Sequence, residues 1–116
     1  MDSLNVVALT GILERDPIVR FDNDTGQARC RGTLRLEEAN ATTGAVYKLF
    51  IPLDAAGKIG EQLAACHGGD VLAITGKLSW QRWTTAKGEE KASLAVFVRQ
   101  CSVVQAVAVP TGVEEG

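Results

Sequence analysis

The stretch QARCRGTLRLE, residues 27–37, alternates between two kinds of side chain with the period of two that a β-strand shows. One set is small or apolar and comprises Ala28, Cys30, Gly32, Leu34 and Leu36. The other set is polar and carries the arginines Arg29, Arg31 and Arg35. The pattern predicts a strand whose apolar face packs into a core while a positively charged face remains in solvent.

Two strand segments precede this stretch along the chain. Residues 4–13 are rich in strand-favouring side chains, and Gly11 interrupts them, which predicts a bulge or bend. Asp16-Pro17 breaks the pattern, and Val19 and Phe21 resume it. Residues 22–26 supply turn-forming side chains and a glycine, so we expect a hairpin there.

In the residues that follow, the spacing of apolar side chains changes from that of a strand to that of a helix and back again. Residues 46–53 alternate as another strand, and residues 54–67 then carry apolar side chains at helical spacing, at Ala56, Ile59, Leu63 and Cys66. Asp54 is positioned as the N-cap of this helix, and Gly68-Gly69 would end it. Residues 70–83 and 92–104 return to strand composition, and residues 84–91 predict the tip of a long hairpin between them.

This order of elements predicts an all-β fold. Three strands, one short helix and two further strands suit a five-stranded OB-fold Greek-key barrel, with the helix between strands 3 and 4 and a long hairpin between strands 4 and 5. In a chain of 116 residues we expect residues 1–108 to form this one domain and residues 109–116 to form a short flexible tail.

Composition limits the classes of function and the cellular compartment. Twelve Lys and Arg against fourteen Asp and Glu give a net charge of −2, which excludes binding of polyanions by bulk charge alone, so any nucleic-acid site must be local. Cys30, Cys66 and Cys101 are far apart in sequence and indicate small core residues rather than a disulfide framework or a zinc site. No leader or long apolar run is evident, so we expect a cytoplasmic protein without a membrane, metal or cofactor partner.

Catalytic constellations are not apparent in the sequence. His67 is the only histidine and lies where the helix is expected to end, which favours a structural role. Glu37-Glu38 and Glu89-Glu90 are adjacent, so strand geometry points each pair of carboxylates apart. Gly57-Lys58 lacks the flanking residues of a phosphate loop. We therefore expect a binding protein and not an enzyme.

The arginine face is the first candidate binding surface. Residues two apart on a strand lie about 6.6 Å apart, so Arg29, Arg31 and Arg35 are spaced to follow a phosphate backbone. Lys48 and Phe50 add a cation and a ring that could stack on a base. The alternative is a solvated face, or one that is ion-paired with Glu37, Glu14 or Asp16.

The expected hairpin around residues 78–91 is the second candidate surface. Trp80, Arg82 and Trp83 lie close together on its first strand, and Lys87 lies at its tip. The two tryptophans have opposite strand parity, so we predict that Trp83 faces the ligand and that one of the two packs on the protein.

At this point the sequence resembles the bacterial single-stranded DNA-binding protein family. The resemblance covers about residues 4–104 and is carried by VALTGILERDPIVRF at residues 7–21, by FIPL at residues 50–53 followed by Gly57-Lys58, and by GGDVLAITGKL at residues 68–78 followed by Arg82-Trp83. It implies that Phe50 and Trp83 stack on bases of single-stranded DNA in replication, recombination or repair. It also implies a homotetramer, with a dimer as the next choice.

The chain departs from the family pattern at particular places. Asn40 and Ala56 stand approximately where the family places further aromatic residues, which implies fewer stacking platforms. The family's long polar linker and acidic tail are missing, so recruitment of replication or repair proteins through a tail is not expected. The second interpretation is therefore a protein-interaction or primosomal accessory module of the same fold, in a replication-restart or mobile-element complex, whose arginine face meets an acidic partner.

Overall fold

The strand and helix segments follow the hydrophobic pattern closely. The computed structural model describes residues 3–21 and 24–108. Within them the elements are β1 (Val7–Leu13), β2 (Ile18–Phe21), β3 (Ala28–Ala39), β4 (Val46–Ala56), α1 (Gly57–Ala64), β5 (Val71–Thr84) and β6 (Glu90–Gln105). The break at Asp16-Pro17 divides the first strand of the barrel into β1 and β2, so the helix follows β4 in this numbering.

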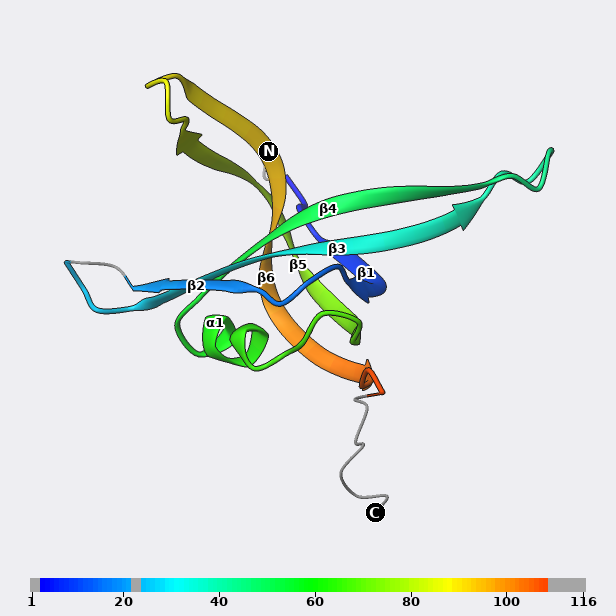
Figure 1. Cartoon of the computed structure of the whole chain (residues 1–116), viewed down its shortest axis with the longest axis horizontal. Coiled ribbons are helices and arrows are strands. Elements are labelled where there is room, and N and C mark those ends of the chain that lie inside the picture. Colours follow the sequence, from blue (N-terminus) through cyan, green and yellow to red (C-terminus); the bar gives the residue numbers. More distant parts are fainter. Residues whose placement is uncertain (1–2, 22–23, 109–116) are drawn as a thin grey trace, which may run out of the picture.

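The sheet closes on itself as an OB-fold barrel, which confirms the predicted fold. Its strand order is β1-β5-β6-β4-β3-β2, and an additional pairing of β1 with β3 joins the two ends. β4 and β6 run parallel through Leu53 and Val96, whereas the other neighbours are antiparallel. In Figure 1 the barrel lies at the crossing of β1, β3, β4, β5 and β6, with α1 beside its lower end.

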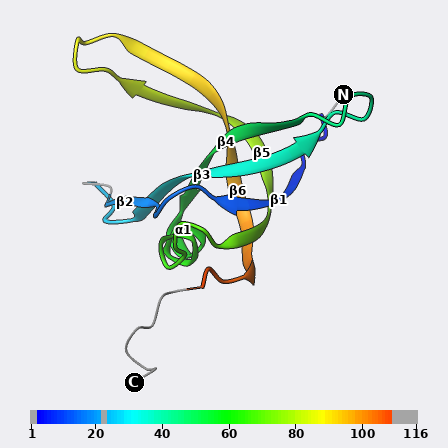
Figure 2. The same ribbon diagram turned by 45° about the vertical axis from the view of Figure 1, so that its right-hand side comes forward.

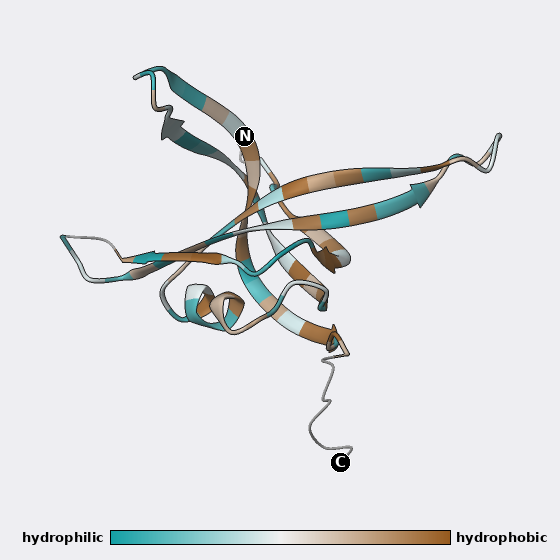
Figure 3. Ribbon diagram, viewed as in Figure 1, coloured by the Kyte–Doolittle hydropathy of each residue, from teal (hydrophilic) through white to brown (hydrophobic). Residues whose placement is uncertain are grey.

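The apolar side chains of β3 fill the interior of the barrel, as the alternation in the sequence predicts. Cys30 and Leu34 are fully buried, as is Leu53 on β4, while the arginines of β3 point to the other face. Brown and teal bands alternate along β3 in Figure 3, which is the same pattern. Side chains of successive strand residues alternate between the two faces, so the inner face of β3 is apolar and its outer face carries the arginines.

The three cysteines are small core residues, as predicted. Cys30 and Cys66 are buried, Cys101 is half-buried, and all three are free. Burial raises the pKa of the Cys30 and Cys66 thiols to about 11, because desolvation disfavours the thiolate. They therefore stay protonated near neutral pH and contribute packing rather than reactivity.

The prediction of Asp54 as a helix N-cap is wrong. β4 continues to Ala56, which is the N-cap of α1 and makes no side-chain capping bond. Asp54 lies opposite Arg31 in the β3–β4 ladder, and its Oδ2 accepts a hydrogen bond from Arg29 Nη2 at 2.8 Å. Residue 54 is therefore in a strand and not at a helix start, because Asp54 is buried in the β3–β4 ladder with Arg29 as its ion-pair partner. Leu63 and Cys66 are buried, as the helical stripe predicted.

Asp70 joins the segment after α1 to the end of β6. Its carboxylate accepts hydrogen bonds from the backbone N–H groups of His67 at 2.9 Å and Val107 at 2.8 Å. These two bonds, with the Val107 bond as the larger cause, lower the pKa of Asp70. His67 is exposed two residues beyond the C-cap Ala65, in agreement with a structural role for this part of the chain.

Two-stranded arms project from the barrel in different directions. The β3–β4 arm and the β5–β6 arm both extend well beyond it, and the turned view in Figure 2 shows the β5–β6 arm standing clear of the other strands. A register shift between Thr75 and Gly76 lies where β5 passes over β6, and a Cβ on Gly76 would stand 2.1 Å from the carbonyl oxygen of Phe97. Only glycine allows this close approach of the two backbones.

No helix within residues 3–21 and 24–108 is long and apolar enough to span a membrane. The predicted tail at residues 109–116 and the first part of the predicted turn, residues 22–23, lie outside the described residues. The hairpin that this turn was expected to close is present, because Phe21 on β2 pairs with Ala28 on β3.

Candidate functional site

The outer face of β3 and β4 carries cations and one ring in fixed register. Phe50 lies directly across from Arg35, and Lys48 lies across from Glu37. Phe50 is 53% exposed although it belongs to a paired strand. A half-exposed ring on a strand surface is available for stacking by a planar ligand.

Two of the three predicted arginines are already engaged by carboxylates. Arg35 Nη1 donates to Glu14 at 2.6 Å and its Nε donates to Glu37 at 3.0 Å. The bond to Glu14 is the main reason that the pKa of Arg35 is raised. For this residue the structure shows the ion-paired arrangement that was the alternative interpretation of the sequence. Asp16 takes a different role, because its carboxylate accepts the backbone N–H of Gly68.

Arg29 and Arg31 differ in whether a carboxylate pairs with them. Arg29 donates to the buried carboxylate of Asp54 at 2.8 Å, yet 44% of its side chain remains exposed. Arg31 is exposed and forms no ion pair within the described part of the chain. Among the three arginines, Arg31 is therefore the one whose charge is least compensated by the protein.

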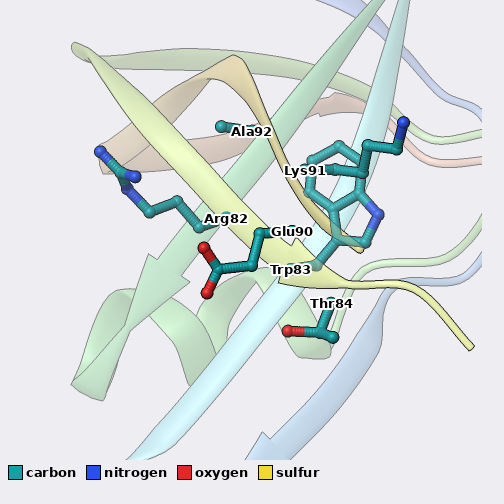
Figure 4. Close-up of a pocket in the computed structure, with 6 residues that line it drawn as sticks. All are labelled: Arg82, Trp83, Thr84, Glu90, Lys91 and Ala92. Carbon is teal, nitrogen blue, oxygen red and sulfur yellow. The ribbon is translucent and has the colours of Figure 1, made fainter. Parts of the chain in front are cut away.

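The β5–β6 arm has two chemically different faces. Trp83 pairs with Lys91, and Gln81 pairs with Ser93 on the same face. Arg82 belongs to the reverse face together with Trp80, since the side chains of a strand alternate. Figure 4 shows Arg82 directed to one side of the arm and Trp83 with Lys91 on the other.

Neither tryptophan packs in the core. Trp80 is 59% exposed and Trp83 is 41% exposed, so the prediction that one of them packs on the protein is not met. Their placement on opposite faces agrees with the predicted strand parity. Lys87 is exposed in the turn that connects β5 and β6 at the end of the arm.

A groove joins the arm to the outer face of the barrel. We call it the Trp83 groove; it has a volume of about 410 Å³. Its principal lining residues are Trp83, Gln81 and Ser93 of the arm, Arg31 and Thr33 of β3, and Pro52 of β4. A second hollow of about 390 Å³ lies towards the end of the arm, where Arg82 and Trp83 both line it together with Lys91 and Glu90.

The groove brings together some of the predicted residues and leaves others apart. Arg31 and Trp83 line it together, although they are far apart in sequence. Phe50 and Lys48 lie further along the same outer face of β4. Arg82 lies on the reverse face of the arm, and Lys87 lies at its end.

Several lining residues were missed by the sequence interpretation. Gln81 shares the strand parity of Trp83, so its position on the same face could have been predicted. The positions of Ser93 and Pro52 in the groove could not be predicted, because they depend on the cross-strand register, which the sequence alone does not supply. Chemically, the site offers a ring, the guanidinium groups of Arg31 and Arg15, the carboxylate of Asp16 and several uncharged polar groups around one open groove.

Comparison with known proteins gives one finding. The model of the family described as "Single-strand binding protein family" matches residues 4–104 of the chain, which includes the whole barrel and nearly all of β6. No curated protein matches the sequence.

Proposed function

The chain belongs to the single-strand binding protein family, a non-catalytic family whose membership implies binding of single-stranded DNA, and we propose that it binds this ligand through the Trp83 groove. The binding has little sequence preference, because stacking and phosphate contacts do not read base edges. It serves DNA replication, recombination or repair in the cytoplasm.

The convergence of Trp83 and Arg31 on one groove is the observation that supports this proposal most strongly. A base that stacks on the indole places its backbone within reach of the Arg31 guanidinium, which lines the same groove. Each stacked base contributes about 1–3 kcal/mol, and each neutralised phosphate adds a salt-dependent term. Unpaired DNA can make both the stacking and the phosphate interactions. Duplex DNA can make only the phosphate contacts, because its bases are stacked inside the double helix.

The strand then follows the outer face of β4. Phe50 provides the second stacking ring and Lys48, two residues before it, provides a phosphate contact. Lys87 contacts the strand from the end of the β5–β6 arm. Arg29 and Arg35 also lie on this surface, where carboxylate partners hold them in place, so they contribute less to phosphate binding than Arg31 does. Arg82 contacts phosphate only where the strand passes around the arm, since it lies on the reverse face.

We further propose that the functional form is a homotetramer, with a dimer as the next choice. The reverse face of the β5–β6 arm supports an oligomer, because Leu78, Trp80 and Leu94 are each about half exposed there. Exposed apolar side chains that adjoin one another are typical of subunit contacts. Light scattering at micromolar concentration tests this, and a monomer would overturn it without affecting the DNA-binding proposal.

Titration of tryptophan fluorescence with oligo-dT at low salt tests the function. We expect quenching by oligo-dT, weaker quenching by a duplex of the same length, and none by a poly-glutamate peptide. Equal binding of all three polyanions would favour the second interpretation, an interaction module for an acidic partner. Absence of quenching by oligo-dT would reject single-stranded DNA binding through Trp83.

A further inference from the structure

The β2–β3 hairpin places like charges directly opposite one another. In its antiparallel register Arg20 on β2 faces Arg29 on β3, and Ile18 faces Arg31. Like charges at directly opposed strand positions destabilise a hairpin. The pairing is therefore difficult to explain as a stabilising feature of the fold.

The positive charge of this cluster is only partly compensated. Asp54 pairs with Arg29, whereas neither Arg20 nor Arg31 forms an ion pair with any residue that the structure describes. Arg20 and Arg31 are both exposed. Three guanidinium groups against one carboxylate leave an excess of two positive charges on one side of a short hairpin.

The same residues surround a small hollow. It has a volume of about 100 Å³ and is lined by Arg20, Arg29, Arg31 and Ile18. Guanidinium groups offer several N–H donors in a planar fork that fits the oxygens of a phosphate group. Cations on three sides of one hollow can share a single tetrahedral anion.

The hollow shares two lining residues with the Trp83 groove. Arg31 and Ile18 line both of them. Neighbouring strands lie about 4.8 Å apart and residues two apart on a strand lie about 6.6 Å apart, so the long side chains of Arg20, Arg29 and Arg31 can reach one common phosphate. A strand that leaves the groove past Arg31 can place that phosphate in the hollow.

We propose that Arg20, Arg29 and Arg31 form a phosphate-binding subsite, which takes a phosphate group of the strand whose base lies in the Trp83 groove. The proposal rests on the proposed function, and it adds Arg20, a residue outside the candidate site derived from the sequence. Asp54 acts as a positioning residue, because its buried carboxylate fixes the Arg29 guanidinium beside the hollow.

Substitution of Arg20 tests this subsite cleanly. Arg20 is exposed and lacks an ion-pair partner in the described structure, so its replacement leaves no buried charge behind. Arg29 is unsuitable, because its loss would leave Asp54 buried without its cation. Arg20→Gln removes the charge, Arg20→Lys keeps it, and Arg99→Gln is the matched control, since Arg99 lies on β6 and lines none of the hollows described above.

The measurement is the dependence of oligo-dT affinity on salt concentration. We expect Arg20→Gln to reduce the log–log slope by up to about 0.7, the value for one phosphate of a single strand, while Arg20→Lys and Arg99→Gln keep the wild-type slope. An unchanged slope for Arg20→Gln, in a variant that still shows full tryptophan quenching, would overturn the subsite and leave the proposed function intact. Loss of quenching by oligo-dT in the wild-type protein would instead reject the proposed function.

A second arm identifies the source of the phosphate. Oligo-dT with and without a 5′-phosphate is titrated against the wild-type protein and Arg20→Gln. An equal slope change for both oligonucleotides assigns the subsite to internal phosphodiesters. A slope change confined to the phosphorylated one assigns it to a terminal phosphate. Thermal unfolding of each variant confirms that the fold is retained.

Discussion

Arg31 and Arg35 lie on the same face of β3, but their surroundings predict different effects on DNA binding. Arg35 is bound by Glu14 at 2.6 Å and by Glu37 at 3.0 Å, so its local charge is more than balanced. Arg31 faces the Trp83 groove without an ion pair in the described structure. A phosphate therefore gains more from Arg31 than from Arg35.

The magnitude follows from the number of phosphates contacted. If three phosphates are neutralised, the log–log salt slope for oligo-dT is about −2, at roughly 0.7 per phosphate. Arg31→Gln is expected to reduce this to about −1.4. Arg35→Gln is expected to keep the wild-type slope but to lower the melting temperature, because Glu14 and Glu37 then lose their shared cation.

The assay combines salt-dependent fluorescence titration with thermal unfolding of the same samples. The reasoning is refuted if Arg35→Gln lowers the slope as much as Arg31→Gln does while its melting temperature stays at the wild-type value. That result would mean that DNA displaces Glu14 and Glu37 from Arg35 at no net cost.

Three further predictions concern single side chains. Trp83→Ala should weaken oligo-dT binding by about 1–3 kcal/mol, whereas Trp80→Ala, on the reverse face, should leave the affinity within twofold of wild type when light scattering shows the wild-type oligomeric state; equal losses in the two titrations under that condition would contradict the assignment of faces. Asp70→Asn should destabilise the protein by about 1.5–3 kcal/mol at neutral pH, as measured by urea unfolding, because it weakens the bonds to His67 and Val107. The pKa of Asp70 is lowered on folding, so this contribution is present above its unfolded value of about 3.8 and is lost as the pH falls through the folded value; a stability gap that widens in acid would contradict this. Cys30, whose pKa is raised to about 11, should resist alkylation at pH 8 in the folded protein and react on unfolding, which mass spectrometry can follow; rapid labelling of the native state would show that the thiol is accessible.

The barrel was predictable because its strands carry a strict alternation. Leu34 and Leu53 are buried where the period of two placed them, and Leu63 is buried where the period of the helix placed it. Local boundaries were less predictable. Asp54 has the composition and position of an N-cap, yet pairing of β4 with β3 extends the strand past it and gives it Arg29 as a partner.

The types of residue that form the site could be predicted from the sequence, but their arrangement in space could be predicted only in part. The sequence indicated that arginines on β3 and a tryptophan on the long hairpin carry the function, but it could not indicate which of them meet. Closure of the barrel brings Arg31 on β3 to Trp83 on β5, although these strands do not pair. Cross-strand register sets Arg20 against Arg29, and strand parity places Arg82 on the opposite face of the arm from Trp83. Ion pairing of Arg35 depends on Glu14, which lies between β1 and β2 and reaches it only in the folded barrel.

Ultraviolet crosslinking of oligo-dT to the protein, with residue-level mass spectrometry, tests the central claim most directly. We expect crosslinks at Trp83 and Phe50, which border the outer face of β3 and β4, and none at Trp80 on the reverse face of the arm. Crosslinks at Trp80 without any at Trp83 or Phe50 would instead place the DNA strand on the other side of the arm, away from the Trp83 groove.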